Sequence, residues 1–252
     1  MNRITAMQRA KRQLVFACDV NSLNDVMNYS SLLLREVGMF KIGPQLWSSR
    51  DGLPAVEHLL KMDIPVFLDL KLHDIPSVTA AAAVNIARLG VDMLTIHALG
   101  GKAMISEVVE QVHKVCAQED LSLPSIIAVT VLTSLSDADL RTMGIQGSTA
   151  DLVSKLANMA IDCGVEGLVC SPVDLRRVIA EVGDEYLLVV PGNRRPLDEQ
   201  GDQKRTLTPE EAVINGASHV VVGRSIRDST AAHITAREIV LEMTNALMNR
   251  KK

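Results

Sequence analysis

The chain has 252 residues, of which 47% are hydrophobic and 22% are charged, and its formal net charge is -4. This length is enough for one large α/β domain with a substantial core. The negative charge argues against a general binder of nucleic acid or of membrane surfaces, because such binding usually needs clustered excess Lys and Arg.

The four cysteines, at positions 18, 116, 163 and 170, have neither CxxC spacing nor the density of a disulfide-linked secreted domain. We interpret them as ordinary thiols in a reducing compartment. Residues 1–13 are basic but lack the apolar core of a signal peptide, and no apolar run approaches the ~18 residues of a membrane span. We therefore expect a soluble, cytoplasmic protein without a membrane partner.

Short β-branched or apolar segments recur at fairly even intervals and predict eight strands. In chain order these are residues 14–20, 39–43, 66–72, 93–98, 125–132, 167–171, 187–192 and 219–226. Segments with helical period or helix-start signals lie between them, for example 74–90, 100–116, 149–164 and 208–217. Strands that alternate with single helices are joined by crossovers and pair in parallel.

Eight such units in about 250 residues predict a (β/α)8 barrel that spans residues 1–252 as a single domain. A doubly wound open sheet with the same order of elements is the alternative. Thr208, followed by Pro209 and two glutamates, is typical of a helix start, and glycines stand where helices should stop. These glycines are Gly38, Gly90, Gly164 and Gly216.

The segment FLDLKLHDIP, residues 67–76, carries several ionisable side chains in an otherwise apolar stretch. Side chains of a strand alternate in direction, so Phe67, Asp69 and Lys71 should share one face while the three leucines between and after them face the helices. Asp69 and Lys71 should then point into the barrel near the carboxyl end of the third strand, where barrel enzymes carry their chemistry.

The same alternation applies to the first two strands. It directs Ala17 and Asp19 into the barrel, and it directs Lys41 inward while Phe40 and Ile42 face outward. An unpaired buried charge is costly, so we expect these charges to form an alternating network. Its members would be Asp19, Lys41, Asp69 and Lys71, with a further carboxylate from Asp74 just past the strand.

One charge at a strand end is usually a solvated rim residue, but three adjacent strands with charges in register are not typical of a rim. Alternating carboxylates and ammonium groups suit a site that holds an anion beside a fixed carboxylate and has an ammonium group ready to donate a proton. They are poorly suited to a redox cofactor or to a nucleophilic triad.

Six motifs occur in the order and spacing of the orotidine 5'-phosphate decarboxylases, and the match covers nearly the whole chain. They are FKIG, LDLKLHDIP, HALGG, AVTVLTS, the GDQKR at the end of the long loop, and VVVGRSI. The chain therefore resembles the bacterial type of this family. The resemblance implies a carboxy-lyase that converts orotidine monophosphate to uridine monophosphate and CO2, the last step of de novo UMP biosynthesis, with no cofactor and no metal.

The resemblance also implies residue roles. Lys71 would donate the proton to the pyrimidine carbon that loses its carboxylate, Asp69 would lie against that carboxylate, and Asp74 would be supplied across the two-fold interface of a homodimer. The catalytic residues by similarity are Lys41, Asp69, Lys71 and Asp74. The substrate-binding residues by similarity are Asp19, Lys41, Thr133, Arg194, Gln203, Gly223 and Arg224.

The phosphate-binding end has a physical rationale of its own. Barrels commonly bind phosphate at the loops after strands seven and eight. Gly223 permits a close approach of the backbone there, and Arg224 offers a bidentate guanidinium. The irregular segment 193–205 has the length of a functional loop, and we expect it to carry Arg194 and Gln203 as part of a lid over the nucleotide.

The chain departs from the family pattern at two places. Ser77 and Val78 follow DIP where Asn-Thr is usual, so the threonine contact to ribose across the interface is in doubt, although Thr79 comes next. PGNRRP replaces the commoner PGIRP, which leaves open whether Arg194 or Arg195 contacts the phosphate. Ser134 is likewise an alternative to Thr133 for the pyrimidine contact.

Two other functions remain as alternatives. A sister decarboxylase or aldolase that acts on a sugar phosphate with magnesium would need a further acidic ligand near the strand ends, for example where Lys41 stands. A catalytically silent barrel that binds nucleotide phosphate would not need the charge array. We interpret His97 as a satisfied core or dimer-edge residue and assign no role to His73.

Overall fold

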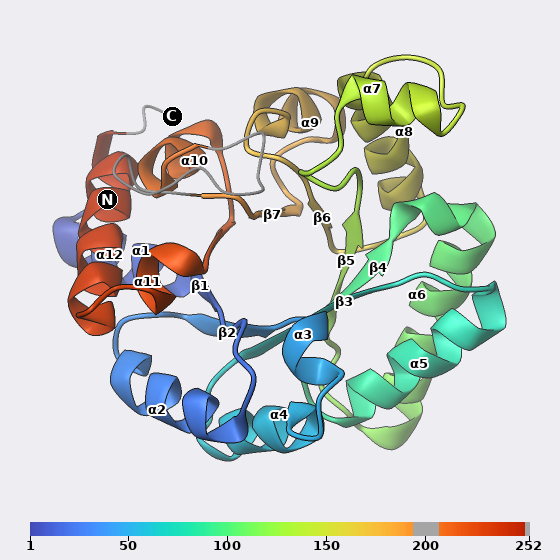
Figure 1. Ribbon diagram of the computed structural model, residues 1–252. Helices are drawn as coiled ribbons and strands as arrows, with labels where there is room; N and C mark the ends of the chain where they lie inside the picture. The colour runs from blue at the N-terminus through green and yellow to red at the C-terminus, as the bar shows by residue number, and fades with distance from the viewer. Residues whose placement is uncertain (194–206, 250–252) are drawn as a thin grey trace.

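The computed structural model describes residues 1–193 and 207–249, and its strands close into a parallel barrel (Figure 1). Each strand pairs with its neighbours in sequence, and the last strand pairs with the first. The strands are β1 (Leu14–Ala17), β2 (Met39–Ile42), β3 (Val66–Leu72), β4 (Met93–His97), β5 (Ser125–Val129), β6 (Gly167–Val169), β7 (Leu187–Val190) and β8 (His219–Val222). The (β/α)8 barrel is confirmed, and the open sheet is excluded because β8 closes onto β1.

Helices surround the strands and cover their outer faces (Figure 1). They are α1 (Arg3–Gln13), α2 (Leu23–Leu33), α3 (Pro44–Trp47), α4 (Gly52–Lys61), α5 (Pro76–Arg88), the 3-10 turn η1 (Ala98–Gly100), α6 (Gly101–Glu119), α7 (Asp137–Thr142), α8 (Thr149–Asp162), α9 (Leu175–Val182), α10 (Pro209–Asn215), α11 (Arg224–Arg227) and α12 (Ala232–Asn249). Within the described ranges, none of these helices is long and apolar enough to cross a membrane.

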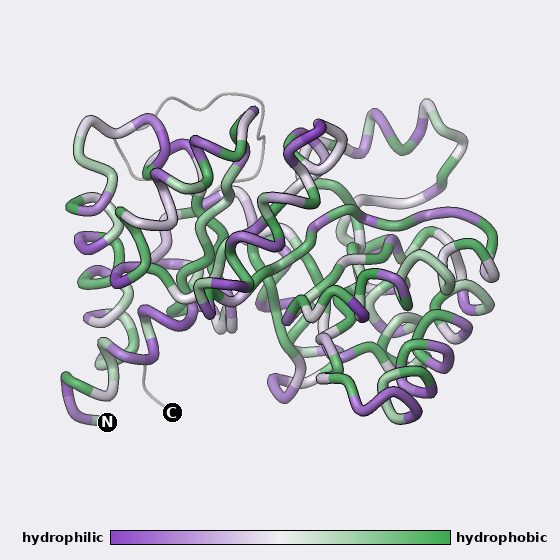
Figure 2. Tube along the Cα trace, turned by 90° about the horizontal axis from the view of Figure 1, so that it is seen from below, coloured by the Kyte–Doolittle hydropathy of each residue, from purple (hydrophilic) through white to green (hydrophobic). Residues whose placement is uncertain are grey.

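The strands separate two apolar layers because successive side chains point to opposite faces. On β2, Met39 faces the barrel interior, while Phe40 and Ile42 pack under the helices. Figure 2, coloured by hydropathy, shows hydrophobic and hydrophilic residues alternating along the outer helices, as expected of helices with one buried face. The interior layer consists of Val15, Ala17, Met39, Phe67, Met93, Ile127, Val129, Val169, Val189 and Val221.

The expected helix start at Thr208 is confirmed. Its side chain accepts a hydrogen bond from the Glu211 backbone N–H, and the Glu211 carboxylate accepts one from the Thr208 N–H, which makes a capping box. Gly90 follows α5 with a φ of 83°, as a helix-terminating glycine should. Gly38 is different, because it does not have a positive φ. A Cβ there would lie 2.6 Å from the Arg12 Cα, so this glycine permits two backbones to touch.

Most strands end earlier than the sequence predicted. The strand expected over 219–226 stops at Val222, because Gly223 adopts φ -113° and ψ -92° and Arg224 already begins α11. The third strand reaches Leu72 as predicted, but its register against β4 shifts between Leu68 and Leu72. This irregularity lies within the segment that carries the charged cluster.

Candidate active site

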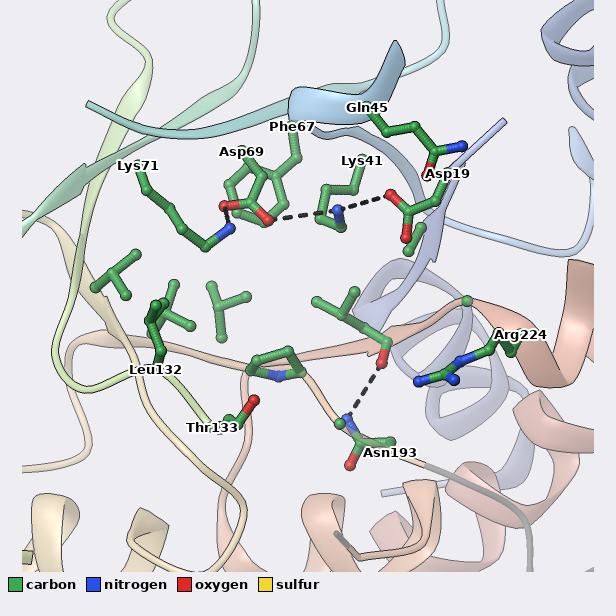
Figure 3. Close-up of a pocket in the computed structure, with 18 of the residues that line it drawn as sticks. Asp19, Lys41, Gln45, Phe67, Asp69, Lys71, Leu132, Thr133, Asn193 and Arg224 are labelled. Carbon is green, nitrogen blue, oxygen red and sulfur yellow. Dashed lines mark hydrogen bonds and ion pairs between the residues drawn. The ribbon is translucent and has the colours of Figure 1, made fainter. Parts of the chain in front are cut away.

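A cavity of about 470 Å³ opens at the carboxyl ends of the strands, a volume within the usual range for small-molecule sites (Figure 3). The strand-end segments of β1, β2 and β3 supply its charged wall. The opposite wall comes from the loops after β5, β7 and β8. The polar and charged side chains of the lining include Asp19, Lys41, Gln45, Asp69, Lys71, Thr133, Asn193, Arg224, Ser225 and Arg227.

Four charged side chains form one row along this wall, alternating in sign (Figure 3). Lys41 Nζ lies 3.4 Å from Asp19 Oδ1 and 3.4 Å from Asp69 Oδ2. Lys71 Nζ lies 2.8 Å from Asp69 Oδ1. The side chains that alternation directed into the barrel therefore do meet in one pocket, and Asp69 is the carboxylate shared by both lysines.

The centre of the row is buried, and its groups hold one another in the charged state. The side chains of Lys41 and Asp69 are only 11% and 12% exposed. Burial acts to lower the pKa of Lys41, but Asp69 and then Asp19 outweigh it and raise that pKa. Burial likewise acts to raise the pKa of Asp69, but Lys41 and Lys71 outweigh it and lower that pKa. The site thus presents fixed charges in a water-poor setting.

Lys71 reaches the row from an irregular backbone. Its φ is 53°, in the left-handed region that residues with a side chain seldom occupy, and it lies inside the register shift of β3. The Lys71 N–H donates to the Thr95 hydroxyl at 2.8 Å, and that hydroxyl donates to Asp69 Oδ1 at 3.0 Å. Sequence reasoning missed Thr95, although a polar residue at an inward-facing position of β4 was a signal.

Arg227 and Gln45 also line the cavity and were missed. The Arg227 guanidinium donates from Nη1 to the Asp19 backbone carbonyl at 3.0 Å, while Tyr29 donates to the Arg227 carbonyl at 2.8 Å. Gln45 donates to the Asn21 side chain at 2.8 Å. The hydrogen bonds donated by Arg227 and Gln45 hold the segment after β1, which carries Asp19, against other parts of the cavity rim.

The proposed phosphate end lies across the cavity from the lysines (Figure 3). Gly223, Arg224 and Thr133 all line the cavity, whereas Ser134 is not among its lining residues. A Cβ on Gly223 would lie 3.3 Å from the Ala17 Cβ, so there is little room for a side chain at this position, and the contact with phosphate stays a prediction. Arg194, Arg195 and Gln203 lie outside the described residues, and the predictions for them stay predictions.

Asp74 does not join the row within its own chain, and the expectation that a partner's Asp74 completes the network stays a prediction. It is exposed and absent from the cavity lining, and its Oδ1 accepts a hydrogen bond from the Ile75 N–H at 2.6 Å. The reason is that the chain leaves the barrel after Leu72 to enter α5. Thr79 is only 1% exposed. Its hydroxyl accepts a hydrogen bond from the Asp74 N–H and is also within donating distance of the Asp74 carbonyl, both at 3.1 Å.

His97 is buried, and one of its ring nitrogens has a hydrogen-bond partner nearby in sequence. Its Nδ1 accepts a hydrogen bond from the Leu99 N–H at 3.3 Å, and its ring stacks on His73 with centroids 5.4 Å apart. Burial lowers the pKa of His97 to about 4, with smaller contributions from His73 and Lys71. In residues 1–193 and 207–249, no group of three or more His, Cys, Asp or Glu side chains is arranged to hold a metal ion.

Comparisons with known proteins give matches over nearly the whole chain. Residues 12–239 match the model of the Orotidine 5'-phosphate decarboxylase / HUMPS family. The chain is 40% identical to the Orotidine 5'-phosphate decarboxylase of Syntrophus aciditrophicus over 252 residues, covering 99% of this chain and 100% of the relative. It is 40% identical to the protein of the same name from Trichlorobacter lovleyi over 233 residues, covering 92% and 95% of the two chains.

A crystal structure of Orotidine 5'-phosphate decarboxylase from Lactobacillus acidophilus superposes with a TM-score of 0.80 at 32% identity, covering 92% of this chain and 99% of that one. The match thus extends over almost the full length in both sequence and fold. This chain belongs to the Orotidine 5'-phosphate decarboxylase / HUMPS family.

Proposed function

We propose that this protein decarboxylates orotidine 5'-monophosphate to uridine 5'-monophosphate and CO2, with Lys71 as the proton donor. The observation that carries the proposal is the row Asp19–Lys41–Asp69–Lys71, in which an ammonium group 2.8 Å from a buried carboxylate faces a nucleotide-sized cavity. Family membership supports the reaction, and the row supports the assignment of roles.

The chemistry needs a cation where negative charge develops. When the bond between the pyrimidine ring and its carboxylate breaks, CO2 leaves and the electron pair stays on a ring carbon that delocalises it poorly. Lys71 stabilises that pair as it forms and then transfers a proton to the carbon. Interactions that strengthen along the reaction path are those that accelerate it.

Asp69 lowers the reaction barrier less directly than Lys71 does. At an effective dielectric near 20, two like charges about 4 Å apart repel by roughly 4 kcal/mol, so repulsion of the substrate carboxylate by Asp69 supplies only a fraction of a decarboxylation barrier. Its larger contribution is to fix both lysines. A site whose charges are already oriented loses little energy to reorganisation when the reaction occurs.

The remaining roles rest on the family resemblance. Asp19, at the outer end of the row, is proposed to bind ribose hydroxyls, and Thr133 to contact the pyrimidine. Gly223 and Arg224 are proposed to bind the phosphate, together with Arg194 and Gln203. Binding of this distant phosphate would order the site before the chemical step.

The active unit is proposed to be a homodimer in which Asp74 enters the partner's cavity. Three observations support this: Asp74 is exposed in its own chain, it stands on a short segment before α5, and two apolar residues close to it in sequence are exposed. Ile75 is 62% exposed and Val78 is 49% exposed. Exposed apolar groups beside a required charge are typical of an interface.

We propose that the reaction needs no metal and no cofactor, and that the partners are the nucleotide and a second copy of the chain, without nucleic acid or membrane. The net charge of -4 supports the absence of a nucleic-acid partner. None of the four cysteines, which all lie in the described part of the chain, forms a disulfide, and this supports a cytoplasmic location.

The experiment is a spectrophotometric assay of orotidine monophosphate loss with protein purified in a chelator. We expect turnover with wild-type protein, unchanged by added EDTA, and none above background with Lys71→Ala of equal thermal stability. If the protein is instead a magnesium-dependent sister enzyme, it should turn over a sugar phosphate, and EDTA should abolish that activity. A silent binder predicts nucleotide affinity in both proteins and turnover in neither.

A further inference from the structure

The buried Thr95 on β4 contacts two members of the charge row without lining the cavity. It is 0% exposed, and its neighbours on the inward face of β4 are Met93 and His97. Its hydroxyl is the group that links β4 to Asp69 and Lys71. Thr95 therefore contacts the row from inside the barrel without reaching the cavity.

The directions of its two hydrogen bonds are fixed by chemistry. The Lys71 backbone N–H can only donate, so the Thr95 oxygen accepts from it at 2.8 Å. The single hydroxyl proton is then left for Asp69 Oδ1, at 3.0 Å. The same carboxylate oxygen also accepts from Lys71 Nζ at 2.8 Å. One hydroxyl thus holds both the backbone of Lys71 and the carboxylate to which its ammonium binds.

The strand pairing explains why a side chain is needed here. Leu68 pairs with Leu94, and Leu72 pairs with Ile96. The three residues 69–71 of β3 therefore lie opposite a single residue of β4, which is Thr95. A bulge of this kind interrupts the regular ladder. The Lys71 N–H takes the Thr95 hydroxyl as its acceptor, and this bond accompanies the left-handed φ of 53° at Lys71.

We propose that Thr95 is a positioning residue for the decarboxylation: its hydroxyl maintains the bulged backbone of Lys71 and the orientation of Asp69, and thereby places the proton donor. The proposal rests on the proposed function in taking Lys71 as that donor. Removal of the hydroxyl leaves a buried N–H without an acceptor and a buried carboxylate with one donor fewer, and both favour rearrangement.

The test is a kinetic comparison of Thr95→Val and Thr95→Ser with wild-type protein. Valine has the shape of threonine without the hydroxyl, whereas serine keeps it. We expect Thr95→Val to lower kcat about 10- to 100-fold, the equivalent of one hydrogen bond to a charged group, with KM for orotidine monophosphate within about threefold of wild type. Thr95→Ser should recover most of kcat.

Thr130→Val is the matched control. Thr130, just past the end of β5, is also a fully buried threonine, but its hydroxyl donates to the Val169 carbonyl at 2.9 Å and not to a member of the row. We expect its kcat to stay within about threefold of wild type, since one buried hydroxyl is lost in each case but only Thr95 touches the row. Equal losses in Thr95→Val and Thr130→Val, or no rescue by serine, would overturn the proposal.

A second readout does not depend on the reaction. In a crystal structure of Thr95→Val we expect Lys71 to leave the left-handed region and its ammonium to leave hydrogen-bond distance of Asp69. An unchanged Lys71 in that variant overturns the role of Thr95 whatever the substrate is. Failure of the wild-type protein to decarboxylate orotidine monophosphate would instead refute the proposed function, and the crystal structure would still decide on Thr95.

Discussion

Lys71 and Asp69 are two residues apart on one strand, yet their side chains meet end to end, with Nζ 2.8 Å from Oδ1. In a regular strand such side chains run parallel along the same face. Here Lys71 has a left-handed backbone, and its ammonium lies against the carboxylate. The central contact of the site thus coincides with a local break in the strand.

Complementation between two inactive variants should test the homodimer. Lys71→Ala and Asp74→Asn each disable every site of their own dimer if Asp74 acts across the interface. After mixing and subunit exchange, half of the dimers are mixed, and each mixed dimer holds one intact site, so we expect about one quarter of wild-type activity. Activity that stays at the level of the separate variants after proven exchange would contradict the shared site.

Arg227 should support nucleotide binding through Asp19. Its guanidinium holds the Asp19 carbonyl at 3.0 Å and lines the cavity, so Arg227→Ala should lower kcat/KM about 10- to 100-fold, the usual effect of losing a charged hydrogen bond. Steady-state kinetics measure this. Arg237→Ala is the control, because Arg237 pairs with Glu36 on the surface and is 63% exposed; its kinetics should match wild type.

Stability should fall in mild acid because of His219. Burial lowers the pKa of His219 from 6.5 to about 4, so the unfolded chain takes up a proton at a higher pH than the folded protein does. The contribution of neutral His219 to the free energy of unfolding is fully present above the pKa of the unfolded chain, and it is lost as the pH falls from 6.5 towards 4. One pKa unit corresponds to about 1.4 kcal/mol, which sets a loss on the order of 3 kcal/mol.

Urea denaturation of wild type and His219→Asn at several pH values between 8 and 4 would measure this effect. Asparagine keeps a hydrogen-bonding group near the position of Nδ1 but does not titrate. We expect the free energy of unfolding of the variant to decline less steeply below pH 6.5. Parallel curves for the two proteins would mean that His219 is protonated equally in the folded and unfolded states.

Two glycines should differ in their tolerance of alanine. A Cβ at Gly38 would lie 2.6 Å from both the Cα and the carbonyl oxygen of Arg12, which are backbone atoms that cannot rotate away. We expect Gly38→Ala to lower the free energy of unfolding by about 3 kcal/mol. At Gly90 nothing lies within 4 Å of the added Cβ, and only the φ of 83° opposes it, so about 1 kcal/mol is expected.

Thermal or urea unfolding of both variants gives the comparison. If Gly90→Ala were the more destabilising of the two, backbone strain rather than close packing would dominate at these turns. The contrast matters because the sequence alone assigned both glycines the same function as helix stops.

The sequence by itself determined the barrel and the inward direction of its charges. Hydrophobic segments of strand length, alternating with amphipathic helices, specify the order of elements. The period of two along each strand then decides that Lys41 and Asp69 face inward while Phe40 and Leu68 face outward. These are local properties, and a single sequence contains them in full.

Only the tertiary structure decided the contacts that join distant segments. Thr95 reaches Asp69 because β3 and β4 pair in a shifted register, and Arg227 reaches Asp19 across 208 positions because β8 closes onto β1. Asp74 is left outside its own row because the chain turns into α5 after Leu72. The register between strands and the closure of the barrel are set by packing between elements. They cannot be predicted from the hydrophobic periodicity within one element.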